Sequence, residues 1–290
     1  MAKKRIAVVT PTRDGLVDIS YTQAVFNLQK ILGDEYDVEL TLQMGVSDIA
    51  TGRNKLWNKW YYYTDVEYLF WVDSDVAFSA GDIKKLLEYE DLDIVGGNYA
   101  KKMFDAKSLL ECASLMQQFD GQVEAIKALE ASMHYVASGK TSIIEGGSKD
   151  GLARTDRLGL GCCLVSRSGA KRLMDWAEAN MEKVRWDWNG DACEGYGVFN
   201  PVVGSDGFQY GEDYSFFERC GKAEVELYFH PEMRLRHTGM VSFDSNFNSV
   251  VELAKKCAKQ GVPYPGTEYE NLASKEDVEV AEELKPEFED

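Results

Sequence analysis

Short apolar runs alternate with longer segments of helical periodicity along the first hundred residues. In residues 19–32 the apolar positions recur at helical spacing, and the pattern stops at Gly33. Strands are predicted over residues 5–10, 38–42, 67–72 and 93–97, and helices over residues 19–32, 48–63 and 83–89. This alternation favours an α/β fold in a single domain, with a mixed, mostly parallel central sheet flanked by helices.

The rest of the chain is less regular. Residues 105–133 are expected to be helical with a break near Gly121, and residues 212–220 are expected to form a helix that ends at Gly221. The remaining elements are predicted as a hairpin or flap over 135–157, strands over 158–165 and 224–229, and a helix over 169–180 capped by Ser168. Residues 185–210 have no clear period, and so long an irregular stretch inside a compact domain predicts a functional loop.

Candidate chemistry appears where predicted strands end. In doubly wound sheets, ligands bind outside the carboxyl ends of the strands. The loop Thr10–Arg13 and the turn Asp73–Asp75 both fall at such ends. We therefore expect the two segments to share a ligand site.

The pair Asp73 and Asp75 follows a long apolar strand. Two carboxylates at one edge suit a hard divalent cation that also takes diphosphate oxygens. A calcium loop of the EF-hand type is excluded, because its fifth position needs Asp or Asn and this chain has Ala77. The alternative is that the acids only end the strand ahead of the next helix, for which Ser79 and Asp82 have the form of a capping box.

The order of short motifs along the chain resembles the GT-A-fold glycosyltransferases that carry a D-x-D motif, in particular small phage-like or large-virus-like members similar to family 2. Residues 69–76 resemble their D-x-D strand, and residues 52–54 resemble a donor-contacting segment. The other matching segments are residues 10–13 (first nucleotide-binding loop), 93–97 (the next strand), 159–165 (a small-residue strand on the acceptor side), 211–213 (the E-D motif of inverting members) and 237–239 (a late His-x-Gly segment). The resemblance covers roughly residues 4–240.

The resemblance implies a role for each matching residue. Asp73, Asp75 and His237 would hold Mn²⁺ or Mg²⁺, and Asp213, with Glu212 beside it, would be the catalytic base. The donor would be bound by Thr10, Pro11, Thr12, Arg13, Arg53, Asp73 and Ser74. The implied GT-A domain spans residues 1–250, with a donor half at about 1–100 and an acceptor half at about 101–250. Residues 251–290 would form a helical, acidic tail.

Each of these residues also has a plainer interpretation. A single histidine such as His237 is often a hydrogen-bonded structural residue, and acids at a helix N-terminus, such as Glu212 and Asp213, are stabilised by the helix dipole. Arg13 and Arg53 suit phosphate contacts, but could equally form ion pairs in an acidic protein. For Trp186 and Trp188, stacking on an acceptor sugar and packing in the core are both open.

Composition narrows the classes of partner. The net charge of −17 and pI of about 4.7 disfavour generic nucleic-acid binding, although much of the acid lies in residues 268–290. Neither a membrane span nor a signal peptide is predicted, because the apolar runs are short, and a cytoplasmic location is expected. The six cysteines form no C-x-x-C pair, which favours reduced structural thiols.

The resemblance thus implies a metal-dependent glycosyltransferase that moves a sugar from a UDP- or GDP-linked donor to an acceptor hydroxyl with inversion. One alternative is a nucleotidyltransferase, although its usual Gly-rich phosphate loop is not matched by residues 10–15, which contain one glycine. Another is a non-catalytic nucleotide- or glycan-binding module. The acceptor stays open between a glycan, a protein, a small molecule and a hydroxymethylated base of phage DNA.

Overall fold

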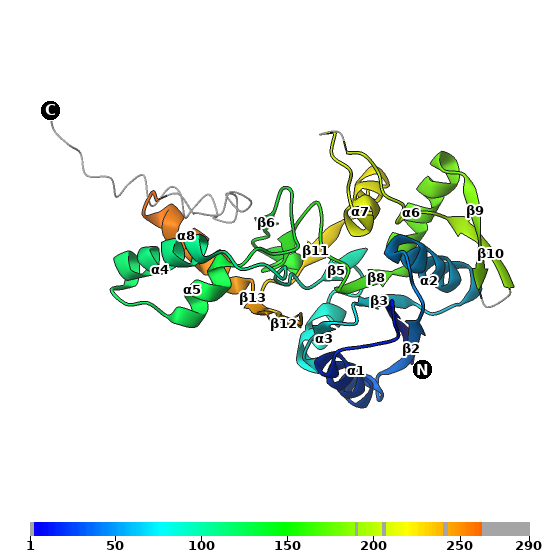
Figure 1. Ribbon diagram of the computed structural model, residues 1–290, viewed down its shortest axis with the longest axis horizontal. Coiled ribbons are helices and arrows are strands. Elements are labelled where there is room, and N and C mark those ends of the chain that lie inside the picture. The colour runs from blue at the N-terminus through cyan, green and yellow to red at the C-terminus, as the bar shows by residue number, and fades with distance from the viewer. Residues whose placement is uncertain (1–2, 189–190, 205–206, 240–242, 263–290) are drawn as a thin grey trace.

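The computed structural model describes residues 3–188, 191–204, 207–239 and 243–262. Its centre is an eight-stranded sheet of order β2-β1-β3-β8-β5-β11-β7-β6 (Figure 1). The strands are β1 (Lys4–Pro11), β2 (Tyr36–Gln43), β3 (Tyr68–Val72), β5 (Ile94–Gly96), β6 (Ser142–Ile143), β7 (Ala153–Arg154), β8 (Cys162–Ser166) and β11 (Leu227–Phe229).

The prediction of a mixed α/β sheet flanked by helices is confirmed, but the sheet is not mostly parallel. β1 is parallel to β2 and β3, and β11 is parallel to β5. β8 lies antiparallel between β3 and β5, and β7 is antiparallel to both β11 and β6. Antiparallel pairings therefore outnumber parallel ones among the described strands of this sheet.

Helices cover both faces of the sheet (Figure 1). α1 (Ile19–Leu32) and α3 (Ala80–Leu87) lie on one face, and α2 (Ile49–Tyr63), α6 (Arg167–Asn180) and α7 (Glu212–Lys222) lie on the other. The predicted caps hold for Asp48, which accepts from the amide of Thr51, and for the Ser79–Asp82 capping box. The predicted cap Ser168 is wrong: α6 begins earlier, and the side chain of Ser166 accepts from the amide of Gly169.

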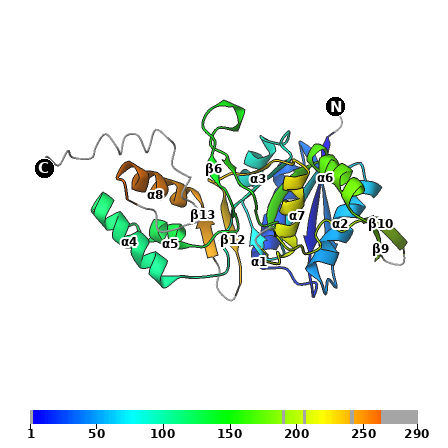
Figure 2. The same cartoon turned by 90° about the horizontal axis from the view of Figure 1, so that it is seen from above.

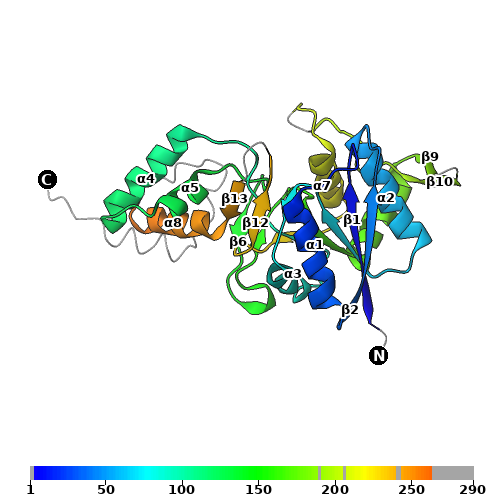
Figure 3. The ribbon, with the colours of Figure 1, turned by 60° about the horizontal axis from the view of Figure 1, so that its bottom comes forward.

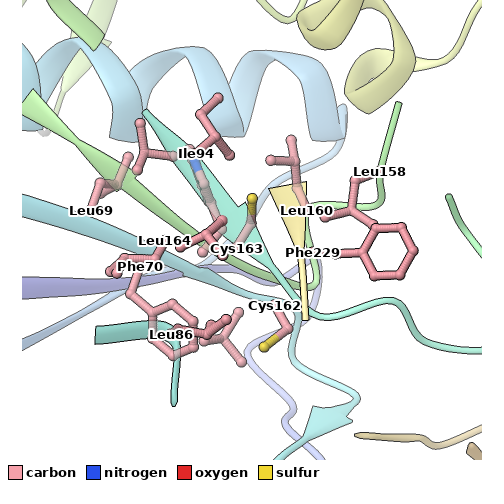
Figure 4. Close-up of a cluster of buried hydrophobic side chains, with 14 of the residues drawn as sticks. Leu69, Phe70, Leu86, Ile94, Leu158, Leu160, Cys162, Cys163, Leu164 and Phe229 are labelled. Atoms are coloured by element: carbon pink, nitrogen blue, oxygen red, sulfur yellow. The ribbon is translucent and has the colours of Figure 1, made fainter. Parts of the chain in front are cut away.

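The centre of the hydrophobic core lies around β8, which runs between β3 and β5. Figure 4 shows side chains of β3, β5, β8 and β11 in contact range of one another, together with Leu86 of α3. Cys162 and Cys163 are both buried on β8, where cysteine acts as a small apolar residue. All six cysteines are free thiols.

A helical lobe lies beside the sheet, as Figures 2 and 3 show. It consists of α4 (Ala106–Asp120), α5 (Ala125–Ser132) and α8 (Asn248–Lys259), which share a small apolar core. A three-stranded sheet of β4 (Val76–Ala77), β12 (Arg234–His237) and β13 (Phe243–Asn246) connects it to the main body. The expected start of the tail at residue 251 falls inside α8, and residues 263–290 lie outside the described part of the chain.

The predicted loop over residues 185–210 is wrong in its first part. β9 (Lys183–Trp188) and β10 (Asp191–Tyr196) form an antiparallel hairpin that contacts α2. Charged and apolar residues alternate along β9, which is the pattern of a strand with one exposed face. The short 3₁₀ helix at Gly147–Lys149 and strands β6 and β7 belong to the expected flap over 135–157.

Among the described residues, no helix has the length and apolarity that a membrane span requires.

Arg167 fixes the C-terminal end of α2 to the start of α6. Its guanidinium donates to the carbonyl oxygens of Trp60 (2.8 Å), Tyr61 (2.8 Å), Thr64 (2.6 Å) and Val66 (2.8 Å). The carbonyls of Trp60 and Tyr61 lie in the last turn of α2, where a helix leaves them without an intrahelical partner, and those of Thr64 and Val66 lie in the segment that follows it. The guanidinium also lies over the ring of Trp60, 4.2 Å from its centroid.

We expect Arg167→Met to lower the free energy of unfolding by about 2–4 kcal/mol, because several carbonyls lose a charged donor together. Urea unfolding measures the change. The matched control is Arg185→Met on the exposed face of β9, where the ion pair with Glu194 is worth at most about 1 kcal/mol. A loss at Arg167 no larger than that at Arg185 would contradict this account.

Candidate active site at the carboxyl edge of the sheet

The turn after β3 is held on both sides by main-chain hydrogen bonds. The amide of Asp73 donates to the carbonyl of Gly161 (3.2 Å), and the amide of Val76 donates to the carbonyl of Asp73 (3.0 Å). The amide of Asp18 donates to the carbonyl of Ser74 (2.8 Å). The last bond places the loop after β1 beside the D-x-D turn, as the shared strand-end position predicted.

The pairing of β4 with β12 brings His237 to Asp75. His237 lies opposite Val76 in the antiparallel register, and the amide of Thr238 donates to the carbonyl of Asp75 (2.8 Å). The Nε2 atom of His237 lies 3.6 Å from Oδ1 of Asp75. Its Nδ1 atom lies 2.8 Å from the carbonyl oxygen of Ala100. If Nδ1 carries the proton and donates it to that carbonyl, the lone pair of Nε2 faces the carboxylate.

A residue that the sequence did not single out completes this cluster. The ammonium group of Lys102 contacts Oδ2 of Asp75. Burial alone would raise the pKa of Asp75, but the interactions with His237 and with the ammonium of Lys102 outweigh it, and the pKa lies below its ordinary value. Asp75 is therefore held as a carboxylate with a cationic neighbour.

Asp75 and His237 fit a divalent cation that is shared with a bound diphosphate. No group of three or more His, Cys, Asp or Glu side chains within the described ranges could hold a metal by itself. Mg²⁺ commonly binds through one or two protein ligands, with substrate phosphates and waters supplying the rest. A carbonyl bonded to the second nitrogen of a histidine is also the usual arrangement for a ligating imidazole. The residues present suit a cation that binds with its substrate.

Arg53 joins the D-x-D turn to the E-D pair. Its side chain, on α2, is 3% exposed. Nη2 donates to Oδ1 of Asp73 (2.7 Å), Nε donates to Oε1 of Glu212 (3.4 Å), and the guanidinium lies 5.2 Å from the ring centroid of Trp71. Asp73 is thus engaged by an arginine, whereas Asp75 faces His237. Nη1 of Arg53 is buried and has no hydrogen-bond partner among the described residues.

Asp213 has the titration behaviour of a base that works near neutral pH. It lies in the first turn of α7, where its carboxylate accepts from the amide of Tyr214 (2.9 Å). Burial and the adjacent charge of Glu212 raise its pKa to about 6, against the opposing effect of Arg53 and the Tyr214 amide. The combination of a half-buried carboxyl, a like charge and a site position is typical of functional acids and bases.

Tyr99 lies between the two carboxylate clusters and was also missed. Its hydroxyl accepts from the amide of Gly161 (2.9 Å), and its ring packs edge-on against the ring of His237 at 5.0 Å. A Cβ atom at Gly159 or Gly161 would lie 2.5 Å from the Tyr99 hydroxyl, so the small residues of this segment leave space for the ring. Tyr99 and Lys102 follow β5, and applying the strand-end rule to that strand would have found both.

In the loop Thr10–Arg13 at the end of β1, the first three residues are buried and Arg13 is exposed. Thr10 is buried, with its hydroxyl 2.8 Å from that of Tyr21, and the Thr12 hydroxyl donates to the carbonyl of Leu16 (3.0 Å). Pro11 is buried at the end of β1, and Arg13 is exposed. The groups of this loop that are available to a ligand are therefore its backbone and the side chain of Arg13.

The structure does not bring the two tryptophans to the other candidates. Trp186 and Trp188 lie on β9, whose hairpin is at the far side of α2 from β12 in all three ribbon views. The ring of Trp188 is covered by the ammonium of Lys59, 4.3 Å from its centroid. Their assignment to the acceptor side receives no support from this position.

No protein-family model and no curated protein matches this chain. Among solved structures, the crystal structure of A197 from STIV is similar, with 13% sequence identity and a TM-score of 0.45. The match covers 83% of this chain and 94% of that chain. A likeness at this level carries no argument about activity, and the site has to be interpreted from its own geometry.

The raised pKa of Asp213 predicts a stabilising substitution. Between about pH 4 and pH 6 the folded protein holds a proton that the unfolded chain has lost, so wild-type stability falls as pH rises through this window. An asparagine at this position would resemble the protonated acid at every pH. We expect Asp213→Asn to raise the free energy of unfolding by about 1–3 kcal/mol at pH 7.5, and by less at pH 4.5.

Urea unfolding of both proteins at the two pH values measures this difference. Asp91→Asn, at an exposed position, is the control and should change stability little at either pH. Destabilisation by Asp213→Asn at pH 7.5 would show that the carboxylate is favourable in the fold and that its pKa is not raised.

Proposed function

We propose that this protein is a metal-dependent glycosyltransferase that moves a sugar from a nucleoside-diphosphate donor to an acceptor hydroxyl with inversion. The observation that carries the proposal is the meeting of Asp75 and His237 beside the Arg53–Glu212–Asp213 cluster at one edge of the sheet. A pair suited to a phosphate-bound cation thus lies next to a carboxyl suited to proton transfer. Such a displacement is assisted by a cation on the leaving diphosphate and by a base that takes the acceptor proton.

The donor would lie between the loop after β1 and the turn after β3. Asp75 and His237 would hold Mn²⁺ or Mg²⁺, and the cation would offset the charge of the diphosphate as it leaves. Ser74 and the backbone of residues 10–13 would contact the nucleotide, with Arg13 available for a phosphate. Asp73 would act with Arg53, whose buried guanidinium sets its orientation.

The acceptor would enter from the side of Asp213. As the acceptor oxygen forms its bond to the anomeric carbon, Asp213 takes the hydroxyl proton. The bond from that carbon to the diphosphate oxygen breaks on the opposite face, and its electron pair leaves with the nucleoside diphosphate. A carboxylate with a pKa of about 6 is ionised at neutral pH and still basic enough to help.

A donor screen tests the proposal. Purified protein is incubated with UDP- and GDP-sugars, with and without Mn²⁺, and the release of nucleoside diphosphate is followed. Release from one donor that stops on chelation is the expected result. Release of pyrophosphate from a nucleoside triphosphate and a sugar phosphate would instead indicate a nucleotidyltransferase, and binding without turnover would indicate a non-catalytic module.

We expect Asp75→Asn to reduce the Mn²⁺-dependent release by at least about 100-fold, because the cation loses its only charged ligand from this pair. The exposed Asp34→Asn serves as the control and should match wild type. Thermal unfolding checks that both variants are folded. If Asp75→Asn released nucleoside diphosphate at the wild-type rate, the proposed metal site would be wrong.

We expect Asp213→Asn to slow transfer by about 10²–10⁴-fold while donor affinity changes little. The pKa of about 6 also gives the direction of the pH dependence: the wild-type rate should rise with pH as Asp213 loses its proton and level off above that value. Donor affinity is measured by calorimetry and the rate by product release. Transfer at the wild-type rate by this variant would mean that another group takes the proton.

A further inference from the structure

Asp75 has a second partner that competes with any metal. One of its oxygens faces His237, and the other is contacted by the ammonium of Lys102. Lys102 and Asp75 are each about one-third exposed, with side-chain exposures of 35% and 37%. A divalent cation bound to this carboxylate would place two cations at neighbouring positions, which Coulomb repulsion opposes.

The backbone that carries Lys102 is fixed by the fold. The amide of Val136 donates to the carbonyl of Tyr99 (3.0 Å), and the amide of Lys101 donates to the carbonyl of His134 (2.6 Å). Between these bonds, the carbonyl of Ala100 meets Nδ1 of His237. The main chain is thus tied to the same histidine that faces Asp75, and the position from which the lysine extends is set by the site itself.

The side chain of Lys102, in contrast, can move. Lysine has a flexible four-carbon stem and an ammonium group that binds as a point charge without a fixed orientation. A partly exposed ion pair contributes little net stability, so the ammonium can leave Asp75 at low cost. It can then reach another acceptor nearby while the backbone stays in place.

We propose that the ammonium group of Lys102 takes part in diphosphate binding and changes its partner when the metal binds. In the metal-free protein it neutralises Asp75; when the divalent cation arrives with the donor, it leaves Asp75 and pairs with a diphosphate oxygen. This rests on the proposed function, since it assumes a diphosphate ligand. Lys102 thereby opposes binding of the free cation and favours binding of the cation together with the nucleotide.

The two effects have opposite signs, and this distinguishes the role from that of an ordinary surface lysine. In Lys102→Gln the carboxylate of Asp75 has no ammonium partner to compete with a metal ion. We therefore expect Mn²⁺ to bind about three- to ten-fold more tightly in the absence of nucleotide. The diphosphate loses a charged partner, so we expect UDP or GDP to bind about ten-fold more weakly in saturating Mn²⁺. Lys101→Gln, which removes the adjacent charge, should change each affinity by less than about two-fold.

Both affinities are measured on the full chain without turnover. Electron paramagnetic resonance of free Mn²⁺ gives the metal affinity, and calorimetry gives the affinity for UDP and for GDP. Thermal unfolding establishes that the lysine variants are folded. The proposal requires both changes in Lys102→Gln, and either one alone, or equal changes in Lys101→Gln, overturns it.

The same data separate this inference from the proposed function. If wild type and Lys102→Gln bind Mn²⁺ equally well, the role of Lys102 is wrong and the metal-dependent site stands. If neither protein binds Mn²⁺ with or without nucleotide, the metal-dependent function and the inference fall together. The strongest support would be that Lys102→Gln, but not wild type, binds Mn²⁺ in the absence of nucleotide and also binds UDP or GDP more weakly in saturating Mn²⁺.

Discussion

The candidate site depends on the buried guanidinium of Arg53. A buried charge is tolerated only where partners of opposite charge compensate its loss of water, and Asp73 and Glu212 provide that compensation. Burial lowers the pKa of Arg53, but the charges of Asp73, Glu212 and Asp213 together raise it above its ordinary value. The arginine therefore stays charged, and it fixes the end of β3 to the start of α7.

This ion-pair cluster explains why the two aspartates of the D-x-D motif have different partners. The spacing of Asp73 and Asp75 suggested that both carboxylates face one ligand. The chain turns directly after β3, where the amide of Val76 bonds to the carbonyl of Asp73, so alternation along the strand no longer applies. Asp73 points to Arg53 and Asp75 to His237 and Lys102.

Most features that depend on residues close together in the sequence are predicted correctly. Alternating runs located the sheet and the helices on its faces, and capping patterns located the start of α2 and α3. The pairing of β4 with β12 could not be found, because β4 has two residues and its partner lies far along the chain. Lys102 and Tyr99 belong to no motif, and only their tertiary contacts single them out: Tyr99 contacts Gly161 and His237, and Lys102 contacts Asp75.

The cluster around Arg53 also links the electrostatic environment of Asp73 to that of Asp213. The pKa of Asp213 reflects a balance in which burial and Glu212 raise it and Arg53 lowers it. Removing Arg53 would free Asp73, unpair Glu212 and raise the pKa of Asp213 at the same time. Loss of activity on substitution of Arg53 would therefore not identify a donor contact. Asp75 pairs with Lys102, whereas Asp213 accepts from the amide of Tyr214, so under the proposed function substitutions of Asp75 and of Asp213 test the metal site and the base separately.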